Sequence, residues 1–146
     1  MLKHNRDSIA RPQVNYTLFN KEGSMPRVVH FEIGADDPER VVEFYSNVFN
    51  WKIEKWEGSG DYWLTTTGDN TQPGINGGIM RRMDPQMTTV NSIDVQSVDD
   101  FAAKITANKG KIVVPKMAIP GVGYIAYCQD TEGNIFGIWQ DDTSVR

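Results

Sequence analysis

The chain contains one pattern of secondary structure twice, and this repeat limits its possible folds more than any other feature. Each copy predicts one strand, one amphipathic helix and then three further strands. The first copy covers about 27–82 and the second about 88–140. Superposing their first strands sets His30 opposite Val90, and the two fourth strands align as GINGGI and GNIFGI. The sequence therefore predicts two tandem copies of one βαβββ module.

The first strand of the first module has two different faces. In VVHFEIGA the alternation puts His30 and Glu32 on one side and Phe31 and Ile33 on the other. Asp37 and Pro38 then predict the start of a helix, whose apolar stripe covers the Phe31 side. His30 and Glu32 are thus predicted to face away from the helix, into the interior that the two modules share.

Several motifs together resemble one known superfamily. They are the HFEI start, the FY pair of the first helix, the segment GVGYIAYCQDTEGN and the ending FGIWQ. The chain resembles the vicinal oxygen chelate superfamily, the group of glyoxalases, bleomycin resistance proteins and extradiol dioxygenases, and within it small proteins related to lactoylglutathione lyase. The resemblance covers Arg27 to about Gln140. It implies an α+β fold in which two modules form a cup of curved mixed sheets with both helices outside, all within one domain at 25–146.

The resemblance also identifies where a metal centre would lie. Metal-dependent members take a His or Gln from each first strand and a Glu from each fourth strand, which together hold one divalent ion. These positions fall on His30, Val90, Gly78 and Gly137. Only His30 can coordinate, so the expectation is no metal and no cofactor in the usual place. A rearranged site using both His30 and Glu32 is an alternative.

The predicted ligand site lies on the inner face of the cup. The alternation of the strands and one Gly/Pro-rich loop select the candidates, which are His30, Glu32, Asn76, Met80, Ser92, Tyr124 and Trp139. Each also has a purely structural interpretation: a neutral hydrogen-bonded histidine, packing at the rim, or a turn at the entry to a strand. Gly78 and Gly137 leave room on the floor of the cup. Cys128 is interpreted as a small buried apolar residue.

Two classes of function follow. The first is a protein that binds a small organic molecule in the cup. The second is an enzyme, a lyase, isomerase or dioxygenase type, in which His30 and Glu32 act as acid and base with or without a displaced metal ion.

The composition of the chain limits the kinds of partner that it can bind. A net charge of −4 argues against nucleic acid binding, and no apolar run reaches the ~20 residues of a membrane span. A single cysteine fits a reducing compartment, so the prediction is a cytoplasmic protein.

Similar proteins usually pair their cups, and 10% aromatic residues exceed the need of one small core, which predicts a homodimer. Residues 1–24 show no apolar period and are interpreted as an N-terminal arm or extension outside the core.

Overall fold

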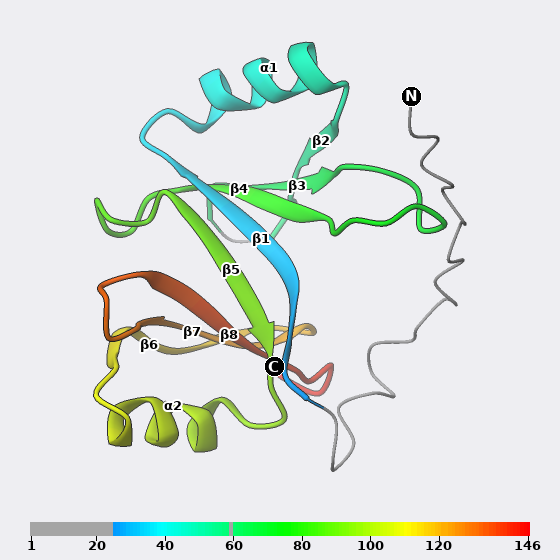
Figure 1. The fold of residues 1–146 in the computed structure, drawn as a ribbon. Helices are drawn as coiled ribbons and strands as arrows, with labels where there is room; N and C mark the ends of the chain where they lie inside the picture. The colour runs from blue at the N-terminus through cyan, green and yellow to red at the C-terminus, as the bar shows by residue number, and fades with distance from the viewer. Residues whose placement is uncertain (1–24, 59) are drawn as a thin grey trace, which may run out of the picture.

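The computed structural model describes residues 25–58 and 60–146, so the predicted arm at 1–24 lies outside the described residues. Two modules follow each other along the chain (Figure 1). The first contains β1 (Arg27–Ala35), α1 (Pro38–Phe49), β2 (Lys52–Lys55), β3 (Tyr62–Thr66) and β4 (Gly77–Arg81). The second contains β5 (Thr89–Asp94), α2 (Val98–Ala107), β6 (Lys111–Ile119), β7 (Gly123–Gln129) and β8 (Ile135–Asp141). The predicted order of one strand, one helix and three strands is confirmed in both copies.

All strands belong to one continuous sheet, in the order β2-β3-β4-β1-β5-β8-β7-β6. The expected curved mixed sheets are the two halves of this sheet, and they join because β1 pairs antiparallel with β5. Within each half the first strand is parallel to the fourth, β1 to β4 and β5 to β8. Among the described strands, β2 and β6 are the edges of the sheet.

The register of the sheet reproduces the repeat residue by residue. Ile33 pairs with Ile79 in the first half, and Ile93 pairs with Ile138 in the second. Across the junction His30 pairs with Ser92 and Glu32 with Val90. The equivalent of His30 in the second module is Val90, and the equivalent of Glu32 is Ser92. Exchanging equivalent residues therefore turns the His30–Ser92 pair into the Val90–Glu32 pair, as expected for a pseudo-twofold axis between β1 and β5.

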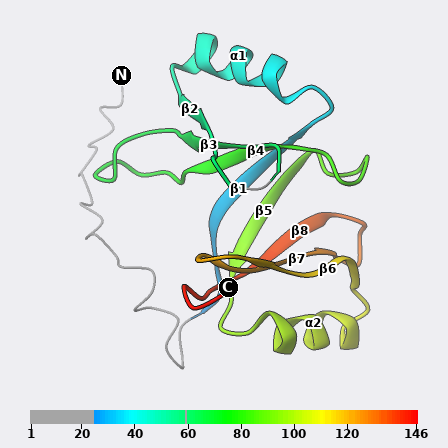
Figure 2. The ribbon, with the colours of Figure 1, turned by 180° about the vertical axis from the view of Figure 1, so that it is seen from behind.

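Both helices lie on the outer sides of the sheet, α1 against the first half and α2 against the second (Figures 1 and 2). Each begins at a capping side chain, since Asp37 accepts a hydrogen bond from the Arg40 amide at 3.2 Å and Ser97 accepts one from the Asp100 amide at 3.1 Å. The predicted placement of the helices outside the cup is confirmed. Neither helix in the described part of the chain is long and apolar enough to cross a membrane.

Two buried apolar clusters hold the strands together. The cluster beneath α2 contains Val95, Val98, Ala126, Cys128 and Ile138. The cluster inside the cup joins the two modules and contains Met80, Met87, Val90, Ile125 and Tyr127. The inner face of the sheet therefore carries a buried apolar cluster surrounded by half-buried side chains, with polar groups set among them.

Candidate functional site at the floor of the cup

His30 and Glu32 lie side by side on the inner face of β1, as the alternation of VVHFEI predicts. Phe31 points to the opposite face, where its ring meets Trp51 at a centroid distance of 6.0 Å. His30 is half-buried, whereas Glu32 is only 3% exposed. A carboxyl group at this depth needs hydrogen-bond partners, because an unpaired buried charge is strongly destabilising.

Two tyrosines supply these partners. The Tyr127 hydroxyl on β7 donates to Glu32 Oε1 at 2.5 Å, and the Tyr62 hydroxyl on β3 also bonds to Glu32. Tyr62 lies 2.6 Å from His30 Nε2, so one phenol connects the imidazole to the carboxyl group. We call His30, Glu32, Tyr62 and Tyr127 the phenol–carboxyl cluster. Its four members come from β1, β3 and β7, and thus from both modules.

Burial determines the protonation of the cluster. It raises the pKa of Glu32, an effect that the hydrogen bonds from Tyr127 and Tyr62 partly offset. It also lowers the pKa of His30. The pKa values of both tyrosines rise above their usual range, through burial first and then through the charge of Glu32. At neutral pH the imidazole is therefore uncharged and both phenols keep their protons, whereas burial shifts the titration of Glu32 toward higher pH.

The positions that the resemblance assigns to a metal centre do not fit a divalent ion. His30 Nε2 already lies against Tyr62, and Val90 is fully buried with no donor atom. A Cβ atom at Gly78 would lie 2.1 Å from the Tyr62 hydroxyl, so this phenol takes the space that a side chain at 78 would need. Among the described residues, no group of three or more His, Cys, Asp or Glu side chains could hold a metal ion.

Ser92 adds an unpaired polar atom next to the cluster. It is 2% exposed, and its Oγ has no hydrogen-bond partner. This oxygen lies 3.0 Å from the place that a Cβ of Gly137 would take, and a ring carbon of Tyr127 lies 3.6 Å from the same place. The absence of a side chain at Gly137 thus leaves the Ser92 hydroxyl beside the Tyr127 ring.

The other predicted site residues lie in different environments. Met80 contacts the cluster, since its Sδ is 3.7 Å from the Tyr127 hydroxyl, and Trp139 packs against the core of the cup. Asn76 precedes β4, accepts a hydrogen bond from the Thr67 amide, and lines a hollow of about 190 Å³ formed by Val29 and the loop 67–76. Tyr124 lies on the helix side of β7, where Lys116 Nζ is 4.2 Å from its ring centroid. The structure thus brings His30, Glu32, Met80 and Ser92 together and places Asn76 and Tyr124 elsewhere.

Sequence reasoning missed Tyr62 and Tyr127, which complete the site. The signal that could have found Tyr127 is its register opposite Gly137, because an aromatic ring often covers a glycine on the neighbouring strand. Tyr62 pairs with Met80 and reaches across to Gly78. Both relations depend on strand registers that periodicity alone does not give.

Comparison with known proteins gives a consistent picture of the fold. The family described as the Glyoxalase/Bleomycin resistance protein/Dioxygenase superfamily matches residues 27–138. A comparison with curated protein sequences gives no match.

Three solved structures illustrate the likeness. Methylmalonyl-CoA epimerase from Mycobacterium tuberculosis has a TM-score of 0.57 at 11% identity, covering 78% of this chain and 87% of that one. A Streptomyces coelicolor methylmalonyl-CoA epimerase variant in complex with 2-nitronate-propionyl-CoA has a TM-score of 0.57 at 17% identity, covering 84% and 99%. A superfamily member from Vibrio splendidus has a TM-score of 0.55 at 14% identity, covering 80% and 100%. At these identities the likeness establishes the fold and no activity.

Proposed function

Because the chain belongs to the glyoxalase/bleomycin resistance protein/dioxygenase superfamily, we propose that it binds a small organic molecule in its cup without the superfamily's usual metal centre. The polar anchor is the phenol–carboxyl cluster, with Ser92 beside it. The apolar walls are the half-buried side chains that pack against the core of the cup, among them Met117, Ile119 and Trp139. A few polar groups within an apolar lining are typical of small-molecule sites.

The observation that carries this proposal is the position of Tyr62. Its hydroxyl occupies the space beside Gly78 and also contacts His30 Nε2. A phenol with a raised pKa is a neutral hydrogen-bonding group and a poor ligand for a divalent cation. In this proposal the tyrosines replace the metal as the group that orients the ligand.

Metal analysis and native mass spectrometry test the proposal directly. Protein purified without chelator should contain well under one transition metal per chain, and a small molecule that co-purifies should be lost in the His30→Ala and Tyr62→Phe variants. Tyr124→Phe is the matched control, because this tyrosine lies on the helix side of the sheet. Stoichiometric metal that disappears in His30→Ala would contradict the proposal.

A second candidate function is acid–base catalysis, and the contact between Tyr62 and His30 favours it. Through Tyr62 a half-buried imidazole is connected to a buried carboxyl group of raised pKa, which is an arrangement able to exchange a proton with a bound molecule. Any turnover of a co-purified ligand should then be lost in Glu32→Gln. It should persist in Glu54→Gln, which changes an exposed glutamate on β2.

We also propose that the protein is a cytoplasmic homodimer. Members of the superfamily often form dimers, and α1 presents three apolar side chains to solvent: Phe44, Val48 and Phe49, which we call the α1 patch. Each is more than half exposed, at 53%, 56% and 55%. An apolar patch of this kind on a helix is typical of a protein interface.

A further inference from the structure

We infer that the ligand of the cup is an amine, bound as its ammonium ion between the carboxylate of Glu32 and the hydroxyl of Ser92. This inference rests on the proposed function and specifies the chemical class of the ligand. Three features of the described residues carry it: the charge balance around Glu32, the unpaired hydroxyl of Ser92, and the aromatic and thioether groups around them.

Charge balance is the first feature. The groups that face Glu32 are Tyr127 from β7, Tyr62 from β3 and, through Tyr62, the imidazole of His30. Both phenols are neutral donors. The ion pairs between described residues involve other carboxylates, and none includes Glu32. A buried carboxylate with two donors and no counter-ion is complementary to a cationic ligand and repels an anionic one.

The unpaired hydroxyl of Ser92 is the second feature, and it is independent of the first. Its Oγ is buried on the same face of the sheet as Glu32, and it has no partner. Leaving such a group unsatisfied costs free energy, so a ligand that bonds to it recovers that loss. An ammonium group has up to three donors, and it can therefore bond to Ser92 and Glu32 together.

The third feature is the character of the surrounding side chains. The hydroxyls of Tyr62 and Tyr127 bond to the carboxyl group, and the thioether sulfur of Met80 lies 3.7 Å from the Tyr127 hydroxyl. Met80 in the core and Met117 at its edge are flexible, so they can move aside for an apolar tail attached to the amine.

Three probes of similar shape and different charge test the inference. Phenethylamine is a cation at neutral pH, phenethyl alcohol is neutral, and hydrocinnamate is an anion. Their dissociation constants are measured by ligand-observed NMR on the full chain at neutral pH. The amine should bind at least about tenfold more tightly than either analogue. Its affinity should fall on acidification, because protonation of Glu32 removes the countercharge.

Variants identify the site. Glu32→Gln should bring the dissociation constant of the amine to within about twofold of that of the alcohol. Glu54→Gln, which changes an exposed glutamate, should leave the preference for the amine unchanged. Ser92→Ala should weaken the binding of the amine by about fivefold, because one hydrogen bond is lost. Circular dichroism and a thermal unfolding curve verify that each variant is folded.

Each remaining outcome contradicts the inference. Equal or tighter binding of the alcohol or of hydrocinnamate shows that the carboxylate does not select a cation. Amine binding that survives Glu32→Gln places the amine elsewhere. If none of the three probes binds, the amine assignment is wrong. The proposed function is judged separately, by the co-purified molecule and its loss in the Tyr62→Phe variant.

Discussion

The two modules share one backbone plan and differ in what their helices present to solvent. The helices start at equivalent residues, Pro38 and Val98, each preceded by a capping side chain. With the same offset of 60 residues, the exposed Phe44, Val48 and Phe49 of the first module correspond to Lys104, Asn108 and Lys109 of the second. The same exposed positions are thus apolar in one module and polar in the other.

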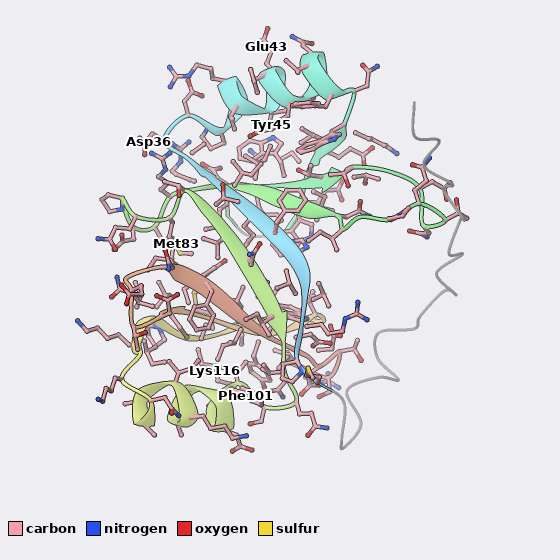
Figure 3. The ribbon with its side chains drawn as sticks, viewed as in Figure 1. Asp36, Glu43, Tyr45, Met83, Phe101 and Lys116 are labelled. Carbon is pink, nitrogen blue, oxygen red and sulfur yellow. The ribbon has the colours of Figure 1, made fainter. Side chains whose placement is uncertain are left out.

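The inner faces of the helices differ as well. Beneath α2 lies a compact buried cluster, against which Phe101 and Ile105 pack. Beneath α1 the contacts run through half-buried aromatic rings, with Tyr45 stacked on Trp51 at a centroid distance of 4.9 Å. Tyr45 lies between α1 and the sheet, Glu43 points away from it, and Phe101 lies between α2 and its strands (Figure 3). The difference is that α2 covers its side of the sheet with a buried apolar cluster, whereas α1 leaves Phe44, Val48 and Phe49 exposed to solvent.

The largest expected effect comes from truncating equivalent core residues. Ile138 and Ile79 occupy the same position of the repeat, and both are fully buried, at 1% and 0% exposure. Ile138→Ala should lower the free energy of unfolding by about 3–4 kcal/mol. Ile79→Ala should cost about 1 kcal/mol less, because the aromatic side of α1 can collapse into the cavity more easily. Urea unfolding measures both, and equal losses would show that α1 is packed as firmly as α2.

The next effect concerns assembly. If the proposed dimer forms through the α1 patch, replacing the patch by the residues of module two, as Phe44→Lys, Val48→Asn and Phe49→Lys together, should weaken dimerisation by at least about a hundredfold, because exposed apolar area drives association. Sedimentation equilibrium gives the dissociation constants. Glu43→Lys on the same helix is the charge control and should change the constant little. An unchanged dimer in the triple variant would place the interface elsewhere.

A smaller effect separates the two faces of β7. Tyr127→Phe removes the hydroxyl that donates to buried Glu32, and it should destabilise the fold by about 1–3 kcal/mol. Tyr124→Phe changes a tyrosine three residues away that packs on the helix side, and it should cost less than about 0.5 kcal/mol. Thermal and urea unfolding report both values. A reversed order would mean that the bond to Glu32 contributes no stability.

The smallest effect is a pH dependence from two inward-facing groups of module one, His30 and Glu32, whose equivalents in module two, Val90 and Ser92, do not titrate. The raised pKa of Glu32 means that, above its ordinary value of 4.5, the native state still holds a proton that the unfolded state has lost. Stability should therefore fall as pH rises from 4.5 through the native pKa, by at most about 1.4 kcal/mol per pH unit. Glu32→Gln should abolish this slope.

His30 acts in the opposite direction. Its pKa lies below the ordinary value of 6.5, so between the native pKa and 6.5 the unfolded state binds the proton and the native state does not. The contribution of His30 is complete above 6.5 and is lost as pH falls toward the native pKa. Chemical unfolding of the wild type, His30→Gln and Glu32→Gln across this range separates the two groups. A profile unaffected by either variant would show that the cluster does not titrate.

The sequence by itself determined the fold and half of the site. Strand alternation and helix periodicity are local, and they were enough to place His30 and Glu32 on one face and the helices on the other. The repeat then predicted the offset between Ile33 and Ile93 that the sheet register confirms. These features depend on residues that are close together in the sequence, so no knowledge of distant contacts was needed.

Only the tertiary structure decided what His30 and Glu32 touch. Tyr62 is 32 residues from His30 and Tyr127 is 95 residues from Glu32, and they meet because β3 and β7 flank the fourth strands at particular registers. The same registers left Ser92 Oγ unpaired beside Gly137 and turned Tyr124 toward α2. A shift of one residue in a strand reverses every side chain, so the composition of the cluster follows from long-range pairing, which local patterns do not specify.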